Sequence, residues 1–266
     1  MLDACHGLLD PDDNGKVVDD SPDGGPTLLG MAAMDLLPSS TAILLHAGAT
    51  PDVISKFDPR DSSLRITPLM VACNNSGPQH RPQCVREGEH LARSISTIAA
   101  LLAGGADPNL ACQWQTGQGP QSPLCSLLQR QSPLKVVQRL VSGGAIVDPP
   151  LDGVEDQFFA SPVLVAVQRH PQAVKLLCLA KANIDVVIED GYFPLFVATG
   201  LNSTQAVKIV LAAGANVNLN SQGAGTPLLH AVAHDYGDIV ELLIDAKVSL
   251  SLVKVSACKP ALLCID

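Results

Sequence analysis

Acidic residues near the start of this sequence are spaced as they are in the first half of a calcium-binding loop. Asp10, Asp12 and Asn14 fall at the first, third and fifth places of such a loop, and Gly15 falls at the sixth. The twelfth place requires a glutamate that binds the ion with both oxygens, but that place is Ser21. We therefore expect a solvated polar turn here rather than a calcium site.

Histidines and cysteines are grouped at two other places. His230 and His234 are four residues apart, so on a helix they would share one face and could bind zinc. The metalloprotease pattern needs a glutamate after the first histidine, but Ala231 follows it, and no third ligand is evident. A second group has four potential zinc ligands, but the six, three and five residues between them do not match a zinc finger: Cys73, His80, Cys84 and His90. We expect a plain surface loop there and predict no metal.

Motifs of nucleotide binding and nucleophilic catalysis are missing from the sequence. Lys16 follows Gly15, but Val17 takes the place of the Ser or Thr that a phosphate-binding loop needs. The sequence contains neither G-x-G-x-x-G nor G-x-S-x-G, and nothing pairs a cysteine with a histidine as nucleophile and base. We predict no enzymatic activity and no cofactor.

The composition indicates a folded helical protein. Hydrophobic residues make up 47% of the 266 positions, charged residues 16% and aromatic residues 3%, so the core must consist of small and aliphatic side chains. The net charge of −9 argues against nucleic-acid binding. Eight cysteines without a C-x-x-C motif, no secretory signal and no long apolar stretch favour the cytoplasm, with the nucleus as the alternative, and exclude membrane insertion.

Two short phrases recur along the chain and converge on one period. The first surrounds a small residue at Ala49, Ala106, Ala145, Ala182, Ala215 and Val248, with successive spacings of 57, 39, 37, 33 and 33. The second, of the type Thr-Pro-Leu, has its second place at 28, 68, 123, 162, 194, 227 and 260, with steps of 40, 55, 39, 32, 33 and 33. Two independent markers with a final period of 33 indicate a repeat architecture.

The physical chemistry of one unit follows from its residues. Ser or Thr before Pro begins a first helix, because the hydroxyl caps free N–H groups and proline suits the first helical position. A second helix follows, such as 204–213 or 237–246, with apolar residues on one face. Gly214 suits a left-handed helix end, and the polar stretch after it predicts a hairpin-like finger.

These units resemble the ankyrin repeat, which has a T-P-L-H start, a G-A-D-x-N end and about 33 residues. The resemblance implies an all-α solenoid of helix-turn-helix repeats with β-hairpin fingers. The sequence departs from the family, because the histidine of T-P-L-H is replaced at every unit by Gly30, Met70, Cys125, Leu164, Phe196 and Leu229. Phe193 and Lys259 replace the capping Thr, which would cost about 1 kcal/mol each without compensation.

We divide the chain into an N-terminal polar segment, 1–21, and an array, 22–266, of about six repeats and a truncated seventh. An insertion lies at 74–93, and longer fingers lie at 112–121 and 149–160. The seventh unit has only a first helix without a polar outer face, so we expect further repeats or a partner to cover that end.

The resemblance implies a scaffold or adaptor that binds another protein, of unknown identity, through the concave face of the array. The alternative is the recognition arm of a larger enzyme, such as a kinase or ubiquitin ligase. By the family's variable places, the expected contacts at fingertips are Trp114, Gln118, Gln121, Gln157, Phe158, Glu189, Asp190, Tyr192 and Gln222. Those expected at first-helix ends are Asn74, Asn75, Gln129, Arg130, Gln168, Arg169 and His234. Trp114, the only tryptophan, is a hot-spot candidate unless it folds back over its own finger.

Overall fold

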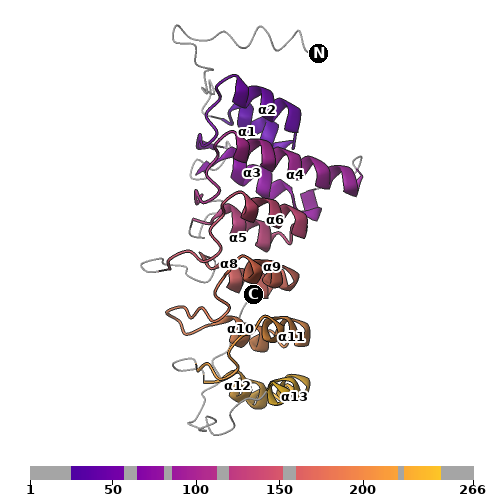
Figure 1. Ribbon diagram of the computed structural model, residues 1–266, viewed down its shortest axis with the longest axis vertical. Coiled ribbons are helices and arrows are strands. Elements are labelled where there is room, and N and C mark those ends of the chain that lie inside the picture. The colour runs from indigo at the N-terminus through magenta and orange to yellow at the C-terminus, as the bar shows by residue number, and fades with distance from the viewer. Residues whose placement is uncertain are drawn as a thin grey trace. The chain divides into compact units, whose positions relative to one another are not determined.

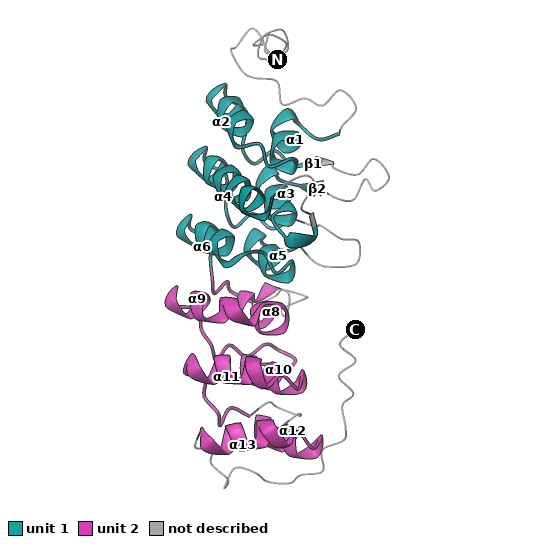
Figure 2. Ribbon diagram, turned by 90° about the vertical axis from the view of Figure 1, so that its right-hand side faces the viewer, with its two compact units in different colours: residues 1–146 teal, residues 147–266 magenta. Residues whose placement is uncertain are grey.

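The computed structural model describes residues 25–56, 65–80, 86–112, 120–151, 160–220 and 225–246, and within them it is built of paired helices (Figure 1). The chain divides into two compact units, Met1–Ile146 and Val147–Asp266 (Figure 2). The described part of each unit holds three helix pairs. The all-α fold class expected from the sequence is confirmed.

In unit 1 the first helices of the three repeats are α1, α3 and α5, and the second helices are α2, α4 and α6. Their bounds are α1 Leu28–Met34, α2 Pro38–His46, α3 Pro68–Asn75, α4 Glu87–Ala103, α5 Pro123–Gln129 and α6 Leu134–Ser142. Two antiparallel strands, β1 Ser55–Lys56 and β2 Arg65–Ile66, form the base of the first finger, and the short 3-10 helix η1 Pro78–His80 follows α3.

In unit 2 the first helices are α8, α10 and α12, and the second helices are α9, α11 and α13. Their bounds are α8 Pro162–Arg169, η2 Pro171–Ala173, α9 Val174–Leu179, α10 Pro194–Gly200, α11 Thr204–Ala212, α12 Pro227–Ala233 and α13 Gly237–Asp245. Within each unit, first helices pack against first helices and second helices against second helices, so every unit has two helical layers (Figure 2).

Hydroxyl caps begin four of the six first helices, as the sequence predicts. The side chains of Thr27, Thr67, Ser122 and Thr226 accept hydrogen bonds from the backbone N–H three residues later, at 3.1–3.3 Å. Each bond satisfies one of the N–H groups that a helix leaves without a partner in its first turn. Gly214 has φ +91°, which confirms the left-handed helix end expected there.

Phe193 occupies the cap position of α10 without making a cap hydrogen bond. Its side chain is instead fully buried, and its ring lies 5.6 Å from the ring of Phe196. Burial of an aromatic side chain contributes several kcal/mol, whereas a cap contributes about 1 kcal/mol. The missing cap is therefore more than offset at this repeat.

Residues close to the cap stack each repeat on its neighbour. The ring of Phe196, three places after its cap position, lies 5.0 Å from the ring of His230, four places after the next cap. In unit 1, Ser126, four places after its cap, donates a hydrogen bond to the side-chain oxygen of Asn74 in the preceding repeat. The third and seventh places therefore face the following repeat, and the fourth place faces the preceding one.

Hydrogen bonds also connect the finger of one repeat to the next. Asn109 accepts a bond from the N–H of Ile146 at 2.7 Å and donates one to the carbonyl of Gly144 at 3.2 Å. Asp52 accepts a hydrogen bond from the N–H of Asp107 at 3.0 Å, and Asp185 accepts one from the N–H of Asn216 at 2.9 Å. Like Asn109, both residues lie three places after the small residue of the recurring phrase. The acidic or amide residue of the recurring phrase thus connects each finger to the next.

Among the described residues, no helix is long and apolar enough to cross a membrane.

The side chain of Asn109 contributes to the stability of unit 1. We expect Asn109→Ala to lower the free energy of unfolding by about 1–2 kcal/mol, because it removes two hydrogen bonds between neighbouring repeats. Urea unfolding followed by circular dichroism measures this change. Glu241→Ala, on the exposed side of α13, is the control and should stay within about 0.5 kcal/mol of the unmodified protein. Equal stability of the two variants would contradict the prediction.

Phe193 should be worth more than the cap that it replaces. Phe193→Thr restores a capping hydroxyl, worth about 1 kcal/mol, but loses a fully buried ring, worth about 3–5 kcal/mol. We expect a net loss of about 2–4 kcal/mol in the free energy of unfolding. Thr226→Ala, which removes only a cap, should cost about 1 kcal/mol. A Phe193→Thr variant as stable as the unmodified protein would show that capping dominates.

Candidate protein-interaction surface

The carboxyl ends of the first helices lie where the sequence predicts them. Gln129 and Arg130 end α5, Gln168 and Arg169 end α8, and His234 follows the last residue of α12. Counted from the cap, all five fall at the seventh or eighth place. Arg169 and His234 are exposed and the other three are half-buried. Burial lowers the pKa of the Arg130 guanidinium. These side chains therefore reach the surface at equivalent points of different repeats.

Asn74 is a correction to the predicted contacts. It also lies at the seventh place after its cap, but its side chain is fully buried and accepts the hydrogen bond from Ser126. The seventh place faces the following repeat, and the small side chain of Ser126 in that repeat leaves room for the amide of Asn74. The neighbouring Asn75 is half-buried and donates a hydrogen bond to the carbonyl of Met34 at 2.8 Å. Both asparagines therefore join repeats.

The finger between α9 and α10 presents acidic side chains. Glu189 and Asp190 are exposed in a tight turn that is closed by hydrogen bonds from the N–H of Gly191 to the carbonyl of Ile188 at 2.8 Å and from the N–H of Ile188 to the carbonyl of Tyr192 at 3.1 Å. Gly191 has φ +81°, a conformation that favours glycine. The turn therefore holds two carboxylates at a defined point of the surface.

Gln121 is a second correction. It was expected at a fingertip, but it is buried at the base of its finger, where its backbone pairs with that of Cys112 through hydrogen bonds of 2.9 and 3.0 Å. Five other predicted contacts lie outside the described residues: Trp114, Gln118, Gln157, Phe158 and Gln222.

A row of aromatic and histidine rings crosses α10 and α12, and sequence reasoning did not find it. Successive rings are those of Tyr192, Phe196, His230, His234 and Tyr236, with centroid separations of 6.1, 5.0, 4.2 and 5.6 Å. Tyr192 and Tyr236 are half-buried, and the His234 ring nitrogen Nδ1 lies 3.0 Å from the carbonyl of His230. The sequence feature that could have predicted this row is the number of residues that separate each ring from the cap of its helix. Such amphipathic rings are common anchors in protein interfaces.

His230 is held neutral by its surroundings. Burial lowers the pKa of its imidazole, and the neighbouring His234 lowers it further. The two rings share one face of α12, as the spacing predicted. Among the described residues, no group of three histidine, cysteine or acidic side chains is placed to hold a metal ion.

The cysteine-histidine group of the insertion falls only partly within the described residues. Cys84 lies outside them, and Cys73 is a fully buried thiol whose pKa is raised by burial. His90 is buried in the first turn of α4. Within the described residues these side chains form no metal-binding group.

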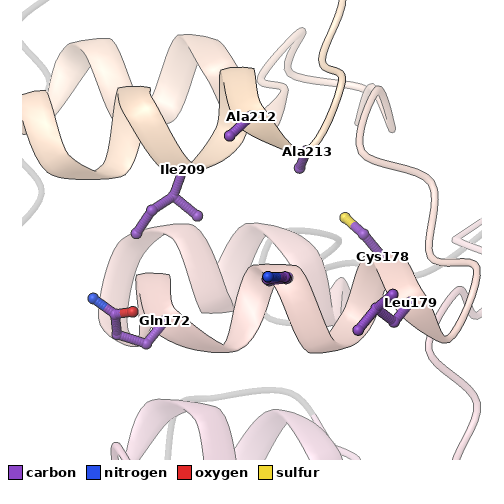
Figure 3. A pocket seen from close by; sticks show the side chains of 7 residues that line it. Gln172, Cys178, Leu179, Ile209, Ala212 and Ala213 are labelled. Carbon is purple, nitrogen blue, oxygen red and sulfur yellow. The ribbon is translucent and has the colours of Figure 1, made fainter.

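A groove of about 450 Å³ lies between the second helices α9 and α11 of unit 2 (Figure 3). Ile209, Ala212 and Ala213 line it from α11, and Cys178 and Leu179 line it from α9. Burial raises the pKa of the Cys178 thiol, so it is not an activated nucleophile. The groove is mainly apolar, and Gln172 and Lys175 are its polar lining residues.

Comparison with known proteins finds one family model that matches part of the second half of the chain. Residues 163–252 match the family model "Ankyrin repeats (3 copies)". No match is found among curated protein sequences. The ankyrin resemblance deduced from the recurring phrases is confirmed in this region.

Solved structures extend the likeness over most of the chain. The ankyrin repeat domain of Bcl-3, a member of the IkappaB protein family, has a TM-score of 0.65 at 23% identity, over 85% of this chain and 88% of that chain. An ankyrin repeat domain from Acinetobacter baumannii AYE has a TM-score of 0.63 at 25% identity, over 83% and 98%. The human ASB11 ankyrin repeat domain has a TM-score of 0.60 at 24% identity, over 84% of each chain. These likenesses establish the fold.

The stability of unit 2 should fall when the pH drops below the ordinary pKa of histidine. The folded-state pKa of His230 is lowered, so between about pH 6.5 and that lower pKa the unfolded chain binds the proton more readily. Stability from this residue is therefore present above pH 6.5 and is lost as the pH falls. Thermal unfolding at pH 7.5 and 5.5 should show a smaller difference in Tm for His230→Gln than for the unmodified protein. His46→Gln, outside the row, is the control, and an unchanged difference in both variants would contradict the assignment.

Proposed function

Because the chain is built of ankyrin repeats, we propose that it is a scaffold or adaptor that binds another protein and catalyses no reaction itself. Ankyrin repeats form a generic protein-interaction module. Binding would use the finger turns and the carboxyl ends of the first helices within each unit, which we name the contact surface. Its described members are Gln129, Arg130, Gln168, Arg169, Glu189, Asp190, Tyr192 and His234.

One observation carries this proposal: equivalent places of the repeat that reach the surface bear chemically different side chains on the same backbone frame. At the eighth place after the cap, the described repeats have Arg130, Arg169, Leu201 and His234 among others. Backbone hydrogen bonds and stacking hold these places rigidly, so little conformational entropy is lost when a partner binds. Rigid presentation of varied side chains suits the recognition of a partner protein.

Around the finger turn before α10 and the end of α12, the charges favour a partner with basic side chains, whereas Arg169 adds a positive charge at the end of α8. Glu189 and Asp190 are exposed beside Tyr192, and Asp235 is exposed beside His234. Carboxylates next to aromatic rings attract lysine and arginine through both charge and cation–π contacts. The net charge of −9 supports the same choice and disfavours nucleic acid as the partner.

The alternative is a recognition arm within a larger protein, in which the array continues past the last described repeat. Val232 of α12 is 57% exposed, although residues at the same place of preceding repeats are buried. Ile244 of α13 is 49% exposed. The truncated seventh unit expected from the sequence would follow this face, and we propose that further repeats or a partner cover the end beyond that unit. A kinase or ubiquitin ligase would be a suitable larger protein, and sequencing the transcript beyond Asp266 tests this alternative.

We further propose a cytoplasmic location, with the nucleus as the alternative. Four cysteines of the described chain are free thiols, and three of them are buried: Cys73, Cys112, Cys125 and, half-buried, Cys178. Buried free thiols are typical of a reducing compartment.

Partner binding should depend on the contact surface and not on the second helices. We expect Tyr192→Ala and His234→Ala each to weaken the affinity for a purified partner about tenfold or more, because aromatic rings anchor interfaces. The partner would be identified by affinity capture with the full chain and mass spectrometry, and the Kd would be measured by calorimetry. Lys208→Ala, exposed on α11, is the control and should leave Kd unchanged.

A loss of affinity in Lys208→Ala without a loss in either ring variant would place the interface on the other layer and reject this surface. Trp114→Ala belongs in the same series, because an unchanged Kd would reject the hot-spot role of that tryptophan. Thermal unfolding of each variant separates lost binding from lost folding.

A further inference from the structure

The first described repeat exposes apolar side chains at places that later repeats bury. Leu28 is 47% exposed and Met31 is 45% exposed, and they lie one and four places after the cap Thr27. At the same two places, the following repeats of each unit have buried residues: Pro68, Val71, Pro123, Ser126, Pro194, Val197, Pro227 and His230. The fourth place contacts the preceding repeat, as His230 and Ser126 show. The exposed side of α1 is therefore the side on which a preceding repeat would stack.

The second helix of this repeat has the same property. Ile43, four places before the end residue Ala47 of α2, is 54% exposed. In unit 2 the equivalent Ile209 lies against α9 of the preceding repeat, where both line one groove. The described helices that pack against α1 and α2 are α3 and α4, which lie on their other side (Figure 2). Leu28, Met31 and Ile43 thus form an apolar surface, which we name the N-terminal face.

The chain itself contains a segment with the spacing of a preceding second helix. Second helices have two adjacent apolar residues near their end, and the cap of the next first helix follows within a limited number of positions. This distance is 22 positions from Leu45 to Thr67, 20 from Leu102 to Ser122 and 15 from Leu211 to Thr226. From Leu9 to Thr27 there are 18 positions, and Leu8 precedes Leu9 to complete such a pair. The spacing is within the range that the described repeats use.

The composition of this segment fits the same role. In residues 2–9, LDACHGLL, the apolar side chains Leu2, Cys5, Leu8 and Leu9 recur at intervals of three, three and one, which places them on one side of a helix. The stretch after them, from Asp10 onward, is polar in composition, as the fingers of the other repeats are. We propose that residues 2–9 form a helix that covers the N-terminal face, in the place of the second helix of a preceding repeat.

Covalent attachment favours this segment over a second copy of the chain as the occupant. A tether of 18 positions holds residues 2–9 near α1 at an effective concentration in the millimolar range. A second copy at micromolar concentration would have to bind about a thousandfold more tightly to compete. The polar segment expected at 1–21 is then polar only after Leu9, from Asp10 onward.

The experiment compares two double variants of the full chain. Leu8→Asp with Leu9→Asp should lower Tm by about 5 °C or more and increase hydrogen exchange in α1, because it places charge against the N-terminal face. Val17→Asp with Val18→Asp adds the same charge outside residues 2–9 and should leave both measurements unchanged. Adding Met31→Gln should reduce the effect of the Leu8 and Leu9 changes, because contacting residues are not additive.

Hydrogen exchange of the unmodified protein provides a test that needs no variant. Amides of residues 5–9 should exchange at least tenfold more slowly than in a synthetic peptide of residues 1–20. Exchange at the peptide rate would overturn the proposal, and so would equal Tm values in the two double variants. Sedimentation distinguishes the remaining occupant: a dimer that Met31→Gln dissociates, but the changes at Leu8 and Leu9 do not, would assign the N-terminal face to a second copy and overturn the proposal as well.

Discussion

Stacking of each helix pair on its neighbours is the interaction on which this structure depends. The helices of the described repeats are mostly six to nine residues long, as in α9 and α11, and helices of that length are unstable alone in water. Each first helix is apolar on both sides and cannot bury them within its own repeat. The third place after a cap therefore contacts the fourth place after the next cap, as Phe196 contacts His230. Stability then accumulates along the chain through nearest-neighbour interfaces.

The period and the helix starts could be predicted from the sequence because they depend on local chemistry. Thr67 and Thr226 cap their helices by bonding residues only three positions away, so the residue types were sufficient. Burial of a particular side chain depends instead on the residue that the neighbouring repeat places opposite it. Asn74 is buried because Ser126 offers it a hydroxyl, and Gln121 is buried because its backbone pairs with Cys112. Neither partner could be identified from a position in one repeat, and both residues were assigned to the surface.

The same dependence on neighbours explains the departures from the family's pattern. The histidine of T-P-L-H is replaced in every repeat, and in the described repeats Gly30, Met70, Cys125, Leu164 and Phe196 are buried at its place, where Phe196 contacts the following repeat. Phe193 gives up a cap hydrogen bond and gains a buried contact with Phe196, so one departure compensates for another. His230, one place later than the family's histidine, joins the ring row instead. Divergent repeats can thus keep the fold while the side chains that reach the surface change, which is what recognition of a particular partner requires.

Comparison between equivalent places also distinguishes packing from function. In the groove between α9 and α11, a packing contact that unit 1 makes has no counterpart. Two places before the helix end, Leu45 reaches within 2.7 Å of where a Cβ on Gly104 would lie, and Leu102 within 2.5 Å of that on Gly143. In unit 2 the smaller Cys178 holds this place opposite Ala213, so the space that a leucine fills elsewhere stays open. This size difference contributes to the opening of the groove. By contrast, the side chains of Glu189 and Asp190 are exposed on a finger turn, and it is these side chains, rather than the groove, that belong to the contact surface that we propose.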